Sequence, residues 1–171
     1  MSERKLVVDQ LKFSYDGLFN VSEIFTLISD WFYDKGYDWY EKMNQEHVTP
    51  EGKQIRIILK PWKKLTDYYK SVIRMKIHFL DIEDIEIDQG GKSLRLNKGQ
   101  IKIIFDGYLI SDYENKWTDQ PFRWMLSFLL ERYFYRSHFR KGQTWVESDI
   151  EDLHQRIKSY LNTFKYNYRN E

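Results

Sequence analysis

DIEDIEIDQGGKSLRLNKG, residues 81–99, is the stretch on which the prediction of the fold depends. If Gly90 and Gly91 form the two-residue loop of a hairpin, each pair of facing residues has numbers with the same sum. The resulting pairs are Ile87 with Leu94, Ile85 with Leu96, Glu86 with Arg95 and Glu83 with Lys98. Apolar side chains then face apolar ones and acids face bases, an arrangement that stabilises neighbouring strands. The stretch therefore predicts an antiparallel hairpin with one defined register.

Alternating patterns on both sides extend this prediction to a sheet. In YKSVIRMKIHF, residues 69–79, apolar residues alternate with basic ones, as in a strand with one buried face. Further strands are expected at residues 4–16, 37–48, 54–62 and 100–112. Because these segments follow one another through short connections, we predict an antiparallel meander.

Three segments have the 3.6-residue period of helices. Residues 21–35 lie between Asn20, a good N-cap with Glu23 three residues later, and Gly36, a common helix terminator. A second helix is expected to begin near Thr118 or Asp119, and a third covers about residues 145–166. The order predicts one α+β domain over residues 1–171, with an antiparallel meander sheet and one helix in the N-terminal half. The two C-terminal helices and that first helix are expected on one face of the sheet.

Composition limits the classes of protein to which the chain can belong. The 171 residues contain 42% hydrophobic side chains, a net charge of +1 and no cysteine. Disulfides and cysteine-ligated metals are therefore excluded, and the balanced charge argues against a dedicated nucleic-acid binder. No stretch reaches the roughly 20 apolar residues of a membrane span. We expect a soluble, cytoplasmic protein without membrane insertion.

A basic cluster follows the aromatic run in RWMLSFLLERYFYRSHFRKG, residues 123–142. Its members are Arg132, Arg136, His138, Arg140 and Lys141. The helical period places them at the C-terminal end of the second predicted helix and just beyond, where unpaired carbonyl groups favour cations. Two interpretations remain: a solvated helix end matched to the dipole, or a contact with phosphates or with an acidic partner.

A second basic group lies on the polar face of the predicted strands. It comprises Lys70, Arg74, Lys76 and His78, with Arg56 and Lys60 on the neighbouring strand. These side chains form either a solvated face or a surface for an acidic partner. They can also meet phosphates, with Trp62 and Tyr68 available to stack on bases.

Motifs of catalysis are missing from the sequence. The histidines have no metalloprotease spacing, and no serine lies in a nucleophile elbow. His154 is expected on the polar side of the last helix. Asp84, Glu86 and Asp88 share one strand face, but the hairpin register gives Glu86 a basic partner, which favours pairing over a metal site. No cofactor is predicted, and an enzyme is the less favoured interpretation.

Several blocks together resemble a set of uncharacterised archaeal single-domain proteins of similar length. The blocks are GLFN at 17–20, YDWYEK at 37–42, DYYK at 67–70, LNKG at 96–99 and SDYENKW at 111–117 with Pro121. The resemblance covers nearly the whole chain and implies an archaeal cytoplasmic protein, but it transfers no functional residue. The predicted topology also resembles the helix-grip fold of START-like binders of lipids and apolar ligands, from which the second C-terminal helix and the bulky aromatic core depart.

Three functions are compatible with these patterns. The leading hypothesis is a non-catalytic structural or interaction protein that contacts another protein through its basic and aromatic surface. The first alternative is a helix-grip binder of a small apolar ligand or lipid. The second alternative is an RNA- or ribosome-associated protein that uses the basic strand face.

Overall fold

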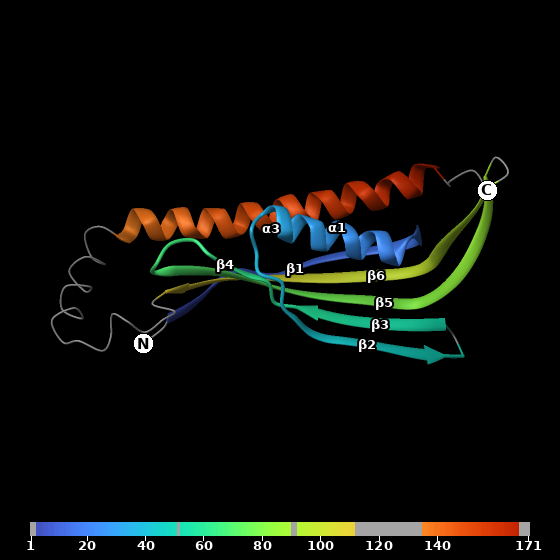
Figure 1. Ribbon diagram of the computed structural model, residues 1–171, viewed down its shortest axis with the longest axis horizontal. Coiled ribbons are helices and arrows are strands. Elements are labelled where there is room, and N and C mark those ends of the chain that lie inside the picture. The colour runs from blue at the N-terminus through green and yellow to red at the C-terminus, as the bar shows by residue number, and fades with distance from the viewer. Residues whose placement is uncertain (1–2, 51, 90–91, 112–134, 168–171) are drawn as a thin grey trace.

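The computed structural model describes residues 3–50, 52–89, 92–111 and 135–167. In this part of the chain, a six-stranded antiparallel sheet forms one layer and two helices form the other (Figure 1). The chain therefore has the α+β class that the sequence predicts.

The sheet is a meander whose last described strand pairs with the first strand of the chain. The strands are β1 (Glu3–Phe19), β2 (Glu41–Thr49), β3 (Gly52–Leu59), β4 (Trp62–Lys64), β5 (Tyr69–Gln89) and β6 (Lys92–Ser111). Their order is β1-β6-β5-β3-β2, with β4 paired to β5. The described pairings are antiparallel.

The pairing of β5 with β6 confirms the register inferred from Gly90 and Gly91. Ile87 faces Leu94 and Glu86 faces Arg95. Both strands are longer than predicted, because β5 joins residues 69–79 to residues 81–89, and β6 continues through the strand expected at 100–112. A bulge at Asp81, whose φ is 52°, shifts the register and lets β5 continue.

Two glycines allow the neighbouring strands to approach this bulge. A Cβ on Gly99 would lie 2.8 Å from the carbonyl oxygen of Leu80, and one on Gly52 would lie 3.0 Å from Cα of Asp81. A side chain at either position would therefore collide with backbone. Beyond this region the β5–β6 ribbon curves towards the side of the sheet on which the helices lie (Figure 1).

Helix α1 (Val21–Asp34) begins and ends as the sequence predicts. The side chain of Asn20 accepts a hydrogen bond from the backbone N–H of Glu23 at 3.2 Å, which satisfies one of the unpaired donors of the first turn. The chain leaves the helix at Gly36, whose φ is 71°. The apolar face of α1 buries Ile24, Ile28, Trp31 and Phe32 against the sheet and α3.

Helix α3 (Tyr135–Asn167) is one continuous helix. The sequence predicts instead that one helix ends near residue 140 and that another begins near residue 145. Helix α3 is continuous through Gly142, which the sequence pattern places in a connection. A Cβ on Gly142 would lie 3.2 Å from Cδ2 of Leu109, so this glycine lets the helix pack closely on β6. Residues 112–134, which include most of the other predicted C-terminal helix, lie outside the described residues.

The core lies between the two helices and one face of the sheet. It includes Ile73, Met75, Ile77 and Phe79 of β5, which the alternation predicts to be buried. From α3 it includes Val146, Ile150, Leu153, Ile157 and Leu161. A Cβ on Gly107 would lie 2.7 Å from Cδ1 of Ile150, so α3 packs directly on the backbone of β6.

Candidate functional site

The sheet surface opposite the helices, here called the outer face, carries the basic residues predicted on β5. Lys70, Arg74, Lys76 and His78 point to this face, because the alternate residues of β5 are buried in the core. Each of these four side chains is half-buried. Lys76, for example, lies between Ile58 and Ile104 in the cross-strand register, and these aliphatic side chains cover part of it.

Arg74 is already engaged by a carboxylate of the protein. Its Nε donates a hydrogen bond to Oδ2 of Asp106 at 2.8 Å. Oδ1 of the same carboxylate accepts a hydrogen bond from the backbone N–H of Gln10 at 3.1 Å. Gln10 has a φ of 47° and lies in a bulge of β1. Arg74 therefore holds β1, β5 and β6 together and is less available to a partner than the sequence suggests.

Two aromatic rings of the outer face are covered by the protein's own cations. The Lys70 ammonium lies 3.6 Å from the centroid of the Trp62 ring, and the Arg4 guanidinium lies 3.6 Å from that of Tyr108. Such cation–π contacts stabilise the surface but occupy the ring faces on which bases stack. Tyr68, the other ring considered for stacking, packs edge to face against Tyr69.

A row of three basic residues crosses the middle of the outer face. Arg56 of β3 faces His78 of β5, and His78 faces Lys102 of β6. We call Arg56, His78 and Lys102 the central basic row. Within the described chain, none of the three forms an ion pair with a carboxylate. Burial, followed by the charges of Arg56, Lys76 and Lys102, lowers the pKa of His78 below its usual value.

A second group of cations gathers around Lys60. Burial, followed by the charges of Lys42, Arg4 and Arg74, lowers the pKa of the Lys60 ammonium. These residues come from distant parts of the sequence, so the curved sheet concentrates positive charge that the balanced net charge of +1 conceals.

The cluster predicted at residues 132–141 lies in another part of the fold. Arg140 and Lys141 are exposed on α3, inside a continuous helix and not at a helix end. The expected match to carbonyl groups at a C-terminal end is therefore wrong for these two residues. Arg136 and His138 belong to α3, but the description does not extend to their side chains, and Arg132 lies outside the described residues. The sheet separates α3 from the outer face, so Arg140 and Lys141 do not share a surface with the basic residues of β5 (Figure 1).

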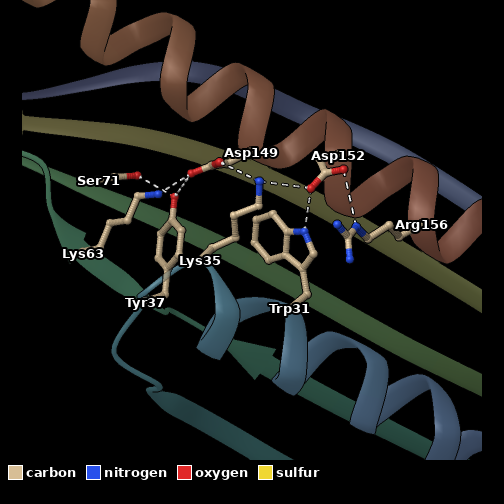
Figure 2. Close-up of polar contacts among 8 residues, drawn as sticks. All are labelled: Trp31, Lys35, Tyr37, Lys63, Ser71, Asp149, Asp152 and Arg156. Carbon is tan, nitrogen blue, oxygen red and sulfur yellow. Dashed lines mark hydrogen bonds and ion pairs between the residues drawn. The ribbon is translucent and has the colours of Figure 1, made fainter.

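A polar cluster that the sequence analysis misses lies under α3 (Figure 2). Asp149, 9% exposed, accepts hydrogen bonds from Lys63 Nζ at 2.6 Å and from the Tyr37 hydroxyl at 2.9 Å. The Tyr37 hydroxyl also lies 3.1 Å from Ser71 Oγ. One turn later, Asp152 accepts a hydrogen bond from Trp31 Nε1 at 2.9 Å and pairs with Lys35 at 3.2 Å. We call these seven residues the Asp149 cluster.

The chemistry of the Asp149 cluster is that of an anchor between layers. Burial, with a contribution from the adjacent Asp149 charge, raises the pKa of Tyr37, so its hydroxyl stays protonated and donates. The hydrogen bond from Trp31, with smaller contributions from Lys35 and Arg156, lowers the pKa of Asp152. Because both acids accept donors from α1 or the sheet, they fix α3 over the core. The sequence contains one signal for this: Asp149 lies three residues after Val146 and four before Leu153, on the apolar face.

The acidic strand considered as a metal site is occupied by local pairs. Glu86 accepts a hydrogen bond from Arg95 Nε at 2.8 Å, and Asp84 accepts one from Asn97 Nδ2 at 2.6 Å. Among the described residues, no group of three histidines or acids is arranged to hold a metal ion. Glu86 therefore has the basic partner that the hairpin register predicts, and Asp84 accepts a hydrogen bond from an amide.

The helical pattern predicts His154 on the solvated side of the last helix, but the structure places it elsewhere. Its side chain is 15% exposed and packs edge to face against Phe13 and Phe105. Its Nδ1 is buried and makes no hydrogen bond within the described chain, although Oε2 of Glu151 lies 3.8 Å away. His154 therefore lies at the edge of the core.

The comparisons with known proteins supply no family for this geometry. No family model matches the chain, and the search of curated proteins finds no match. Neither described helix combines the length and the apolar character that crossing a membrane requires.

Proposed function

We propose that this chain is a non-catalytic interaction protein whose outer sheet face binds an acidic partner protein. The observation that carries the proposal is the central basic row, in which Arg56, His78 and Lys102 lie side by side without carboxylate partners among the described residues. Bases that face bases across strands are unfavourable in the isolated protein. An acidic partner relieves this repulsion when it binds.

The surroundings of the row favour a protein over a nucleic acid. Ile58 and Ile104 lie beside Lys76, so cations alternate with aliphatic surface of the kind that a folded partner buries. The rings of Trp62 and Tyr108 are covered by Lys70 and Arg4, which leaves few open platforms for bases. RNA binding through phosphates alone remains the alternative outcome of the experiment below.

The experiment compares two defined probes on the full chain. Labelled oligoglutamate and single-stranded RNA of matched length are titrated by fluorescence anisotropy at several salt concentrations. We expect oligoglutamate to bind more tightly than RNA, with an affinity that falls as salt increases. Tighter binding of the RNA would assign the face to nucleic acid and overturn the proposal.

Two charge reversals of equal size locate the surface. Lys76→Glu/Lys102→Glu changes the outer face, and Arg140→Glu/Lys141→Glu changes the exposed side of α3. We expect only the first pair to abolish oligoglutamate binding, and both variants to retain the circular dichroism spectrum of the parent. Loss of binding in the α3 variant alone would move the interaction to the other layer.

The helix-grip alternative depends on an apolar cavity between the sheet and α3. In the described part of this layer, Phe79, Phe105 and Ile150 belong to one continuous buried cluster. The described packing favours a filled interior over a ligand cavity. Titration with a fluorescent fatty acid distinguishes an apolar cavity from a filled interior, since only a cavity gives saturable one-to-one binding.

A further inference from the structure

We propose that the central basic row is an oxyanion-binding site whose occupation is coupled to protonation of His78. The inference rests on the proposed function, because the oxyanion in that case is a side-chain carboxylate of the acidic partner. The proposed function names only an acidic partner. The oxyanion site specifies that the carboxylate oxygens of this partner are recognised and that binding depends on pH.

The geometry of the row suits one oxyanion shared by neighbouring strands. Adjacent strands lie about 4.8 Å apart, so side chains from β3, β5 and β6 can reach the same bound group. The row continues at both ends into neutral donors, because Gln45 faces Arg56 and Ser14 faces Lys102. The cross-strand row from β2 to β1 therefore offers hydrogen-bond donors and contains no acid.

Three other bases of the sheet form ion pairs with an acid. Arg95 pairs with Glu86 at 2.8 Å, Lys53 pairs with Glu46 at 2.8 Å, and Arg74 pairs with Asp106 at 2.8 Å. The sequence thus places charge pairs across its strands in several positions but not in the central basic row. This contrast distinguishes the row from an ordinary charged surface.

A small hollow lies beside the row. It has a volume of about 100 Å³ and is lined in part by Gln45, His47, Gln54, Arg56 and His78. A water molecule occupies about 30 Å³ of the liquid, so the hollow accommodates a carboxylate or a phosphate group. Its polar lining comes from β2, β3 and β5, and its residues supply amide, guanidinium and imidazole donors.

The charges that surround His78 make its protonation depend on a bound anion. Arg56 faces it from β3, Lys102 from β6 and Lys76 from its own strand, while His47 lines the same hollow from β2. The nearest acid in the adjacent row is Asp16, which accepts a hydrogen bond from Gln100 at 3.0 Å. Without ligand, this environment disfavours the imidazolium. An anion in the row reverses the local field, so binding takes up a proton and strengthens as pH falls.

The test follows the His78 imidazole by NMR through a pH titration of the full chain. The chain has four histidines, and His78→Asn identifies the resonance by its loss. Saturating oligoglutamate is expected to raise the pKa of His78 by about one unit, which corresponds to about tenfold tighter binding to the protonated form. Acetate and inorganic phosphate serve as single-group probes that distinguish a carboxylate from a phosphate source.

Matched variants separate the row from general electrostatics. Lys102→Gln is expected to weaken oligoglutamate binding and to reduce the shift of His78. Arg95→Gln, which removes a base of the hairpin that is paired with Glu86, is expected to change neither.

The possible failures are distinguishable. Oligoglutamate can bind without changing the pKa of His78 and with an affinity that does not depend on pH. In that case the proton-coupled site is wrong, and the proposal of an acidic partner stands. If phosphate alone moves His78, the oxyanion site stands and the acidic protein partner is wrong. Absence of any response to all three probes overturns both proposals.

Discussion

Arg74 and Asp106 form an ion pair at 2.8 Å on the outer face, and the carboxylate is 1% exposed. The buried member of such a pair cannot be satisfied by solvent when its partner is removed. The pair also fixes the β1 bulge, because Asp106 accepts the backbone N–H of Gln10. Its role is therefore to hold three strands together beneath the proposed binding surface.

Arg74→Leu is expected to destabilise the protein by about 2 kcal/mol, because it leaves a buried carboxylate with one donor. Adding Asp106→Asn should restore part of this stability, since the amide keeps an acceptor for Gln10 without a charge. Urea denaturation of the parent, the single variant and the double variant measures both effects. Equal stability of the single and double variants would contradict this assignment.

Asp149→Asn is expected to cost about 3 kcal/mol, because it leaves the mostly buried Lys63 ammonium without its counter-charge. Asp152→Asn is the matched control on the next turn of α3. Its carboxylate and the Lys35 ammonium are both more than a third exposed, so the loss should stay below about 1 kcal/mol. If urea denaturation shows similar losses of stability for the two variants, burial does not determine how much each acid of the Asp149 cluster contributes.

Gly107→Ala is expected to destabilise by about 2 kcal/mol, because its Cβ would lie 2.7 Å from Ile150 and 2.8 Å from Val146. Gly142→Ala lies at the same contact between β6 and α3 but has its nearest side-chain atom at 3.2 Å. The gain of about 1 kcal/mol in helix propensity offsets its milder contact, so this variant should be close to neutral. Thermal unfolding midpoints compare the two, and the reverse order would refute the proposed packing.

The lowered pKa of His78 predicts that stability decreases in acid. Above the ordinary histidine pKa of about 6.5, the folded and unfolded states both hold a neutral imidazole. Below it, the unfolded chain binds a proton before the folded protein does, so the free energy of unfolding falls with decreasing pH. His78→Asn should lose less stability than the parent between about pH 7 and about pH 5, with His47→Asn as control. Parallel pH profiles of parent and His78→Asn would argue against this shift.

The hairpin and α1 could be predicted because their determinants are local. Gly90 and Gly91 define the register, and Asn20 with Gly36 defines the helix ends. The start of α3 could not be predicted in this way, because Gly142 lies inside the helix and packs against Leu109. A glycine in the sequence does not reveal whether it ends a helix or admits a neighbour.

The central basic row was only partly visible in the sequence. The alternation predicts Arg56 and His78 on one basic face, but Lys102 is not among the residues predicted there. The hairpin sum of 181, however, sets Lys102 opposite Phe79, whereas the bulge at Asp81 moves it opposite His78. The Asp149 cluster was missed for a related reason, since its members come from four elements that only the tertiary fold brings together.

The pairing of β1 with β6 has a consequence for how the protein forms. Glu3 faces Ser111, so the pairing of β1 with β6 joins residues that lie 108 positions apart in the sequence. The β5–β6 hairpin needs only local loop closure and can form early, whereas completion of the sheet waits for contacts of high sequence separation. We expect the complete sheet to form slowly, with β1 and β6 open to aggregation until the two strands pair.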